Sequence, residues 1–351
     1  MVPRTKSQKQ VALFSHLQQY ERERSATINI RASIHPTVIQ VGLRFAEGMI
    51  LGSNARCVGT LQALKAVIHD YTTPPKQVLK RHLDSYLKPQ ISFLVQFRPM
   101  SISMGNAIRY LKMKIAKLEP DMPEADAKLY LCECIDTFIN ERIMLADQII
   151  SSAGAAKISS GDVLLTYAKS SIVQKTLLEA HRQGKQFRVI VIDSRPKYEG
   201  KQLLKVLLDA GIPCSYELLN AVPYMMREVS KVFLGAHGFF SNGTLLSRVG
   251  TAVVAMEARA QNVPVMVCCE TYKFSERVQL DSFVFNELGD PDELIMTEIS
   301  SWRDIPSLKL LNLMYDVTPA EYISMVITEI GMIPCTSVPV VLREYHACWN
   351  T

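Results

Sequence analysis

The sequence has 351 residues, of which 48% are hydrophobic and 21% charged, and its formal net charge is +5 at pH 7. That length allows two domains with cores of their own, and the composition is ordinary for a globular protein. The lysines and arginines are spread along the chain, whereas a nucleic-acid binder more often concentrates them on one face. No apolar run reaches the roughly 18 residues of a membrane span, and no apolar core follows the basic start as in a signal peptide.

The cysteines indicate a reducing compartment. They lie mostly within apolar segments, and none has the CxxC spacing of a zinc site or a redox motif. Buried free thiols account best for them, so we expect no metal site and a location in the cytosol. The eight cysteines are Cys57, Cys132, Cys134, Cys214, Cys268, Cys269, Cys335 and Cys348.

The first part of the chain, residues 1–34, is expected to be a leader with one apolar patch. A basic and polar stretch precedes Val11, and the patch follows it. Its apolar side chains can dock on the body of the protein or on a partner. They are Leu13, Phe14 and Leu17.

Residues 35–157 have a helical period with no strand pattern, so we expect an all-helical domain. Its helices are expected at 35–46, 54–70, 78–96, 101–118 and 123–153. In the last helix, the apolar residues expected on the buried side are Leu129, Leu131, Ile135, Phe138, Ile143, Leu145, Ile149 and Ile150.

Residues 158–345 alternate between short apolar runs and helical patterns, which predicts a Rossmann-like domain with a doubly wound parallel sheet. The fold class is therefore α/β, with a helical N-terminal domain followed by that sheet domain. Strands are expected at 162–167, 187–193, 214–219, 232–234 and 263–269, with helices at 171–181, 200–210, 222–229 and 251–261.

The end of this domain is expected to hold a helix and a strand. Thr318-Pro319-Ala320-Glu321 has the pattern of a helix start, with a capping hydroxyl, a proline in the first turn and a carboxylate to complete the box. We therefore expect a helix through Ile330 that ends at Gly331. A final strand is expected at Val338–Leu342, and residues 346–351 are expected to form a loose tail.

The stretch Lys231–Thr251 holds the greatest chemical interest. A short apolar strand runs into a loop punctuated by glycines, and a helix follows. In an open parallel sheet such a loop lies beyond the carboxyl end of its strand, where ligands bind. His237 lies in this loop without a matched carboxylate nearby in sequence, so we interpret it as structural rather than catalytic.

Two further positions follow predicted strands. Arg195 can hold an anion with two hydrogen bonds, or pair with carboxylates at a domain or subunit seam. Ser170 opens a helix, where it can cap that helix or help hold a phosphate. Walker A, GxGxxG, GxSxG and HExxH motifs are all absent, so the sequence favours none of the corresponding activities and no cofactor.

Several long blocks of the sequence resemble a known family. LLTYAKSS, VIDSRP, LGAHGFFSNGTLLSRVGT, VPVMVCCETYKF and YDVTPAEYISMVITEIGMIPCTSVPVV resemble the regulatory subunits of eukaryotic translation initiation factor 2B. SNARCVGTLQALKAVIHDYTTPP and FRPMSISMGNAIRYLK are most similar to its delta subunit. The resemblance runs from about Val11 to Leu342, and the fold is shared with methylthioribose-1-phosphate and ribose-1,5-bisphosphate isomerases.

Two catalytic groups of those isomerases have no counterpart here. A cysteine follows their first strand, in a pattern like LTHCNTG, and Ala168 stands at that position. The methylthioribose enzymes carry an aspartate in the sequence NGD, where this chain has Thr244. An alanine has no thiolate and a threonine is no acid or base at neutral pH, so the resemblance implies a catalytically dead isomerase scaffold. The candidate vestigial anion cleft then consists of Ser170, Arg195, Asn242 and Gly243.

The resemblance implies a regulatory subunit of the guanine-nucleotide exchange complex that reloads initiation factor 2 with GTP. The implied partners are the beta, alpha, gamma and epsilon subunits of a decamer with beta–delta pairing. A further implied partner is the alpha subunit of initiation factor 2, whose phosphorylation the chain would sense in the integrated stress response. No direct contact with nucleic acid or membrane is expected.

The residues for these contacts are predicted from their chemistry. We expect subunit contacts at Leu13, Phe14 and Leu17 and at Leu311 and Leu313, with the internal core as the alternative for the second pair. For contact with the initiation factor, the candidates are Arg56, Arg98 and Arg109, with solvated helix faces as the alternative.

Two other functions stay open. A sensor could bind a sugar phosphate or a nucleotide through the glycine loop and Arg195 without converting it. An active sugar-phosphate isomerase would need a replacement nucleophile and base, and the sequence offers neither.

Overall fold

The computed structural model describes residues 11–17, 33–119, 121–295, 299 and 301–350. The chain forms two compact units. Among the described residues, the helical unit takes in 33–149, 270–274 and 343–350, and the sheet unit takes in 11–17, 150–269 and 275–342. A short segment from the second half of the chain, 270–274, thus belongs to the helical unit.

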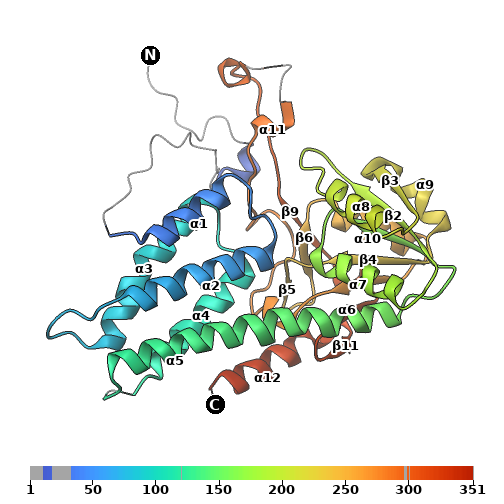
Figure 1. Ribbon diagram of the computed structural model, residues 1–351. Helices are drawn as coiled ribbons and strands as arrows, with labels where there is room; N and C mark the ends of the chain where they lie inside the picture. Colours follow the sequence, from blue (N-terminus) through green and yellow to red (C-terminus); the bar gives the residue numbers. More distant parts are fainter. Residues whose placement is uncertain (1–10, 18–32, 120, 296–298, 300, 351) are drawn as a thin grey trace. The chain divides into compact units, whose positions relative to one another are not determined.

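The helical unit is built mainly of the helices α1 to α5 (Figure 1), and two of them begin at a capping side chain. The His35 ring accepts a hydrogen bond from the Thr37 amide at the start of the first helix, and Ser101 does the same for Met104 before the fourth. The first four expected helices are confirmed with ends that differ by one or two residues, and the fifth begins one residue from its expected start. They are α1 Pro36–Ala46, α2 Ser53–Asp70, α3 Leu79–Phe97, α4 Ile102–Ala116 and α5 Glu124–Thr137.

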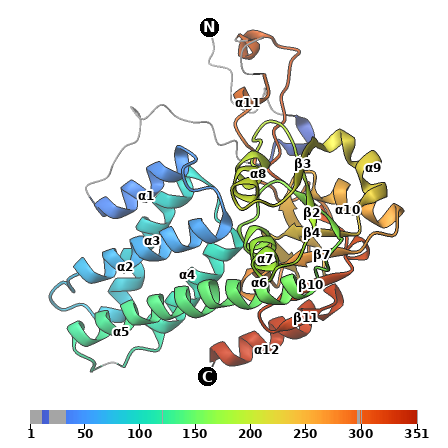
Figure 2. The same ribbon diagram turned by 45° about the vertical axis from the view of Figure 1, so that its right-hand side comes forward.

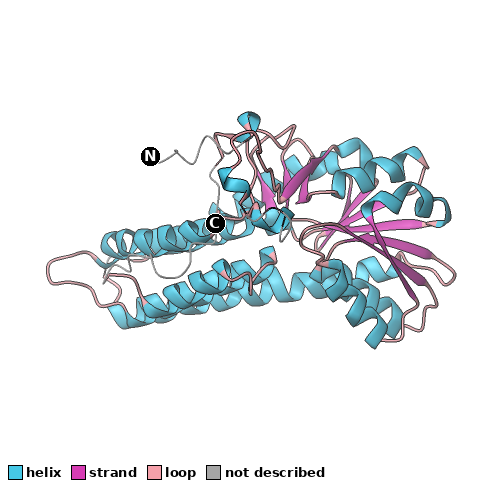
Figure 3. Cartoon of the chain, turned by 90° about the horizontal axis from the view of Figure 1, so that it is seen from above, coloured by secondary structure: helices cyan, strands magenta, loops and turns pink. Residues whose placement is uncertain are grey.

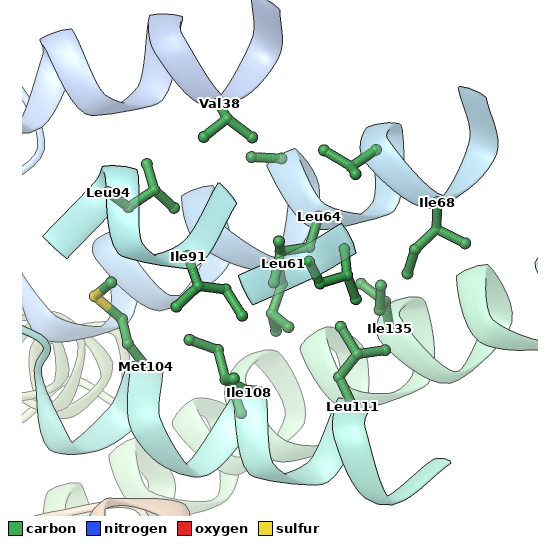
Figure 4. Close-up of a cluster of buried hydrophobic side chains, with 14 of the residues drawn as sticks. Val38, Leu61, Leu64, Ile68, Ile91, Leu94, Met104, Ile108, Leu111 and Ile135 are labelled. Carbon is green, nitrogen blue, oxygen red and sulfur yellow. The ribbon is translucent and has the colours of Figure 1, made fainter. Parts of the chain in front are cut away.

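Apolar side chains from α1 to α5 form one core in this unit (Figure 4). Each fully buried leucine, valine or isoleucine stabilises the fold by about 1.5–3 kcal/mol relative to an exposed one. Tyr272, from the 270–274 segment, is part of the same core. The labelled members are Val38, Leu61, Leu64, Ile68, Ile91, Leu94, Met104, Ile108, Leu111 and Ile135.

The helix after α5 departs from regular α geometry. Phe138–Leu145 is a π-helix, η3, and α6, Ala146–Ala156, continues from it. The expectation that Leu129, Leu145 and Ile149 face inward is wrong, because these side chains are 61%, 49% and 42% exposed. The wider π turn moves the buried stripe by one residue beyond Phe138, while Leu129 lies about 200° around the helix from Leu131.

The sheet unit contains the predicted doubly wound sheet (Figure 2). Its strand order is β11-β10-β7-β4-β1-β2-β3, and every neighbouring pair is parallel except β10 with β11. The strands are β1 Val163–Tyr167, β2 Arg188–Asp193, β3 Cys214–Leu218, β4 Lys231–Gly235, β7 Val265–Cys268, β10 Met325–Thr328 and β11 Gly331–Ile333.

Helices connect these strands, as the alternating sequence pattern predicts. Central strands such as β1 and β4 are buried along nearly their whole length, which explains their continuous apolar sequences. The connecting helices are α7 Ser171–Arg182, α8 Gly200–Asp209, α9 Val222–Met225 and α10 Thr251–Ala260.

A second, smaller sheet takes up the stretch that we expected to be a glycine-punctuated loop (Figure 3). β5, Gly238–Phe240, pairs antiparallel with β6, Leu245–Arg248, and β6 pairs antiparallel with β9, Tyr315–Thr318. β8 consists of Phe274–Ser275. The stretch between β4 and α10 is therefore a hairpin held in a sheet.

The two predictions for the end of the chain are wrong. The sequence from Thr318 forms only one 3-10 turn, η8 Ala320–Tyr322, and then enters β10, where Val326 and Ile327 are fully buried. The β-branched residues and the pairing of β10 with β7 outweigh the helix-start signal. The expected strand at 338–342 is the start of α12, Val338–Asn350, because Pro339 suits a first helical turn.

The remaining elements are short. No helix in the described part of the chain is long and apolar enough to span a membrane. The short elements are η2 Ala12–Phe14, η4 Leu219–Ala221, η5 Met226–Glu228, η6 Thr271–Lys273, α11 Asp292–Ile295, η7 Trp302–Asp304 and η9 Cys335–Ser337.

Candidate functional site

The strand order places the expected ligand site at the carboxyl ends of β1 and β4. The chain runs from β1 through β2 to β3 at one edge, and then returns to β4 on the other side of β1. In open α/β sheets, such a switch point is where ligands bind. The residues that follow these two strands therefore decide what chemistry the site can support.

Ala168 follows β1 directly and is buried. Its φ angle is 53°, in the left-handed region, and its amide donates to the carbonyl of Ile192 at 2.8 Å. The methyl group offers neither a nucleophile nor a proton. Ser170 caps α7 by accepting from the Val173 amide at 3.5 Å. A Cβ on Gly235 would come within 2.2 Å of the Ser170 hydroxyl oxygen, so the end of β4 packs against this cap.

The turn between β5 and β6 is bound to a segment further along the chain. The Thr244 hydroxyl oxygen lies 2.8 Å from the carbonyl of Gln279 and 2.9 Å from the side-chain oxygen of Asn242. The Asn242 amide donates to the same Gln279 carbonyl at 3.0 Å, and Ser241 donates to the carbonyl of Glu276. The polar side chains of the turn are thus hydrogen-bonded to backbone carbonyls of the same unit.

Gly243 has a conformation that other residues adopt only with strain. Its φ angle is 79°, and a Cβ there would lie 2.9 Å from the carbonyl oxygen of Cys335. Asn-Gly turns with positive φ are typical of tight hairpins. The Asn-Gly pair therefore serves the hairpin between β5 and β6.

Paired polar groups lie at the carboxyl ends of β1 and β2. The Tyr167 hydroxyl lies 2.6 Å from that of Ser194 and donates to the carbonyl of Val249 at 2.5 Å. Burial raises the pKa of Tyr167 to about 12. Arg248 makes two hydrogen bonds to Glu199, at 2.8 and 2.7 Å. These side chains are thus hydrogen-bonded to other groups of the same chain.

Arg195 does not join this group. Its side chain is exposed, and its guanidinium has no partner among the described residues. Of the predicted anion cleft, Ser170, Asn242 and Gly243 have structural contacts and Arg195 faces solvent. The cleft as an anion site stays a prediction.

Asp316 is a site residue that the sequence analysis missed. Its carboxylate accepts from the amides of Gly250, at 2.6 Å, and Ala252, at 3.0 Å, at the start of α10. Burial raises its pKa to about 7, although the two amides act in the opposite direction. Only the folding of β9 against β6 brings this residue to a helix that starts some 65 positions earlier, so no local pattern signals the contact.

The apolar leader patch and the 311–313 stretch meet inside the sheet unit. Phe14 and Leu17 are buried with Leu288, and Leu311 and Leu313 pack partly buried against them. The first patch therefore docks on the body of the protein, one of its two predicted alternatives. Leu13 remains 57% exposed beside this cluster.

A loop of the sheet unit also presents apolar side chains. The ring of Phe283 packs on that of Phe14 with centroids 5.5 Å apart, and its side chain is still partly exposed. Val284 beside it is well exposed, as are Val278 and Leu280 earlier in the loop. Exposed apolar side chains grouped in this way are typical of a protein-binding surface.

Two of the three arginines predicted to contact the initiation factor are buried. Arg56 is fully buried, donates to the carbonyl of Pro99 and lies 5.4 Å from the ring centroid of Phe45. Arg98 is 6% exposed and donates to the carbonyl of Leu51 at 3.2 Å. These two predictions are wrong, because both guanidinium groups satisfy backbone carbonyls inside the unit. Only Arg109 is exposed.

The described cysteines are free thiols, as expected, and most are buried. Burial raises the pKa of Cys57 to about 12 and of Cys335 to about 11, so these thiols stay neutral. In the described ranges, no group of three or more histidine, cysteine, aspartate or glutamate residues is placed to hold a metal ion.

These features define an α/β protein whose sheet carries neither a thiol at residue 168 nor a carboxylate at residue 244. The chain belongs to the initiation factor 2 subunit family, whose family model matches residues 49–335. The resemblance that we drew from the sequence blocks is thereby confirmed.

The similar proteins include both translation initiation factor subunits and isomerases. The chain is 47% identical to translation initiation factor eIF2B subunit delta of Schizosaccharomyces pombe, over 96% of this chain and 74% of that protein. It is 48% identical to the Dictyostelium discoideum delta subunit, over 97% of this chain and 57% of that protein. With the ribose 1,5-bisphosphate isomerase of Pyrococcus furiosus the identity is 33%, over 74% of this chain and 79% of the isomerase.

The fold matches a solved structure of an assembled complex. A chain of the tetrameric eIF2B-beta2-delta2 complex from C. thermophilum superposes with a TM-score of 0.83 and 38% identity, over 93% of this chain and 100% of that chain. The eIF2B delta structure from Chaetomium thermophilum gives a TM-score of 0.72, over 85% of this chain and 99% of that one.

Proposed function

We propose that the chain is a delta-type regulatory subunit of the guanine-nucleotide exchange complex that reloads translation initiation factor 2 with GTP. The observation that carries this proposal is the extent of the similarity. Delta subunits match over nearly the whole chain, and the match with the chain of the beta2-delta2 tetramer extends through both units. An isomerase relative matches a smaller share of the chain at lower identity.

The residues at the sheet edge support a role without catalysis. The position after β1 carries a buried methyl group, and the hydroxyl at residue 244 is hydrogen-bonded to the chain's own backbone. A thiolate nucleophile and an ionised acid–base group are the tools that isomerase chemistry would need there. Exchange activity would then belong to other subunits, gamma and epsilon, and this chain would help to form the regulatory core in the cytosol.

Pairing with a beta-type subunit is supported by the apolar surface near the leader patch. Leu13 and Val284 are exposed, and both lie beside side chains that pack into the cluster of Phe14 and Leu17. Apolar side chains at the centre of an interface contribute most of its affinity. Leu311 and Leu313, half-buried in the same cluster, would support this surface from beneath.

Sensing of phosphorylation would follow from differential binding. A phosphate on the alpha subunit of initiation factor 2 adds about 1.5 to 2 negative charges. A partner that binds two states of the complex with different affinity shifts their populations, and such couplings amount to about 1–3 kcal/mol. Of the predicted contact residues, Arg109 has the exposure that such a contact requires.

An exchange assay on the assembled complex tests the proposal. We expect the complex that contains this chain to release GDP from initiation factor 2, and phosphorylated factor to inhibit that release. Arg109→Ala should weaken the inhibition, and Arg56→Met, which retains the buried packing, should leave it unchanged. Full exchange and full inhibition by a complex that lacks this chain would contradict the proposal.

A further inference from the structure

The helix that begins as α5 contains one extra residue. Its buried side chains are spaced three or four residues apart, as in an α-helix, except for one step of five residues. Buried residues follow at α-helical steps from Leu131 and Cys134 in α5 to Phe138, the first residue of η3. The next buried residue is Ile143, five positions later, and the step coincides with the π-helix η3. π-helical turns are rare, occur mostly as single turns within α-helices and are frequent at functional sites.

Beyond Phe138 the sequence contains a second apolar stripe. In the π-helical geometry, which we call the π register, the side chains of this stripe are exposed to solvent. Counted from Phe138 in α-helical steps, Leu145 and Ile149 would follow on the buried side. In the structure these two side chains are exposed, while Ile143, Ala146 and Asp147 are buried. Two registers of the same segment are thus each supported by apolar side chains, and something must select between them.

A segment from the second half of the chain contacts the helix where the π turns begin. We call Glu270–Phe274 the clamp segment. The Tyr272 ring packs edge-on against Phe138 with centroids 5.7 Å apart, and its hydroxyl donates to Asn54 at 2.7 Å. Asn106 donates to the carbonyls of Tyr272 and Phe274, at 2.8 and 2.9 Å. The clamp segment is therefore fixed to α2 and α4.

The same segment contacts the helix after the π turns. Glu270 is fully buried, accepts from Asn54 at 2.5 Å, forms an ion pair with Lys273 at 2.6 Å and is hydrogen-bonded to Asp147. Burial acts to raise the pKa of Glu270, but the Lys273 ammonium and these hydrogen bonds outweigh it and hold the pKa below its usual range.

The two contacts require the π geometry. Phe138 and Asp147 are nine positions apart, about 2.5 turns of an α-helix, so α geometry would direct them to opposite sides. The wider π turns bring both side chains to the clamp segment. We infer that the clamp segment is a register latch: it holds Phe138–Leu145 in the π register, and without it the segment adopts an α register in which Leu145 and Ile149 turn inward.

The latch decides which side chains the helix presents at its surface. With both contacts made, Met144, Leu145 and Ile149 are exposed. In the α register, Leu145 and Ile149 would be withdrawn and Asp147 would turn outward. One residue, Cys269, separates the clamp segment from the end of β7 in the sequence.

Thiol labelling of the full-length chain tests the latch. Leu145→Cys serves as the reporter, and Leu129→Cys, exposed on α5 before the π turns, serves as the matched control. Maleimide labelling is measured at each position by peptide mass spectrometry. Asp147→Ala should slow labelling at position 145 at least ten-fold and leave the rate at position 129 unchanged. An unchanged rate at position 145 in a folded Asp147→Ala chain would overturn the inference.

A deletion tests the excess residue without disturbing the clamp segment. Removal of Asn140, which is exposed in η3, restores α-helical spacing between Phe138 and Ile143 while both latch contacts remain possible. We expect this chain to fold, with position 145 still labelled rapidly. Removal of Glu133, exposed in α5 where no residue is in excess, should abolish folding. Equal damage from the two deletions would show that η3 holds no spare residue.

Discussion

Arg56 offers the sharpest test of the corrected assignment in the helical unit. The sequence suggested a contact with a partner, whereas the structure buries the guanidinium completely beside Phe45 and the carbonyl of Pro99. Arg56→Ala removes a hydrogen bond from a charged group, which contributes about 1.5–3 kcal/mol, and a cation–π contact of about 2 kcal/mol when desolvated. Arg56→Ala also leaves a cavity in the place of a fully buried side chain, and such truncations cost about 2–5 kcal/mol, so we expect a net loss of about 3–5 kcal/mol after the relief of the buried charge.

Two control variants separate the possible causes. Arg56→Met retains most of the volume and buries no charge, so it should cost much less than Arg56→Ala. Arg109→Ala, at an exposed position of the same unit, should change stability by less than about 0.5 kcal/mol. Urea unfolding of the full-length chain, followed by circular dichroism, measures all three. A loss below about 1 kcal/mol for Arg56→Ala would refute the assignment of a structural role.

Three further predictions concern the sheet unit. Gly243→Ala should lower stability by at least about 1 kcal/mol, because φ is 79° and the added Cβ meets the Cys335 carbonyl; an unaltered urea midpoint would refute the turn geometry. Phe14→Ala should raise amide exchange at residues 14–17 at least ten-fold, since the aromatic contact in the cluster is lost, while Leu13→Ala should not; equal effects would argue against docking of the leader patch. The carboxyl of Asp316 binds its proton more tightly in the folded chain, with a pKa of about 7 against about 3.9 unfolded, so its contribution to stability is full below about pH 4 and is lost as pH rises through about 7. Asp316→Asn should therefore reduce the fall in stability between pH 5 and pH 8, and identical pH profiles of the two chains would contradict this.

The elements that the sequence predicted well are those whose local pattern and tertiary role agree. The helices of the helical unit have apolar stripes and caps, and the strands β1, β2, β4 and β7 are continuous apolar runs between helices, so both were predicted nearly to the residue. The strand β10 was missed because its preceding residues, Thr318 to Glu321, carry a true helix-start signal that only a single turn uses. Pairing with β7 is a long-range effect that no local window contains.

The sequence predicted which positions make up the candidate site, but not the contacts that their side chains make. Ala168 and Thr244 follow from a comparison of sequence blocks, and the structure adds that one is buried and the other is bound to the Gln279 carbonyl. Arg56 was misassigned because a charged residue in a helix is usually exposed, and only the tertiary fold supplies the carbonyl that permits burial. The π turns at Phe138 were missed because an α-helical count of the apolar residues is equally consistent with the sequence.

Purification of the full-length protein from cytosol tests the central claim most directly. We expect native mass spectrometry to find this chain in a stoichiometric complex with a beta-type subunit, and that complex to contain the gamma and epsilon subunits of the exchange factor. Leu13→Lys should reduce the amount of beta-type partner, whereas Leu208→Lys, an equally exposed position on α8, should not. A stable homodimer of this chain without any exchange-factor subunit would contradict the account.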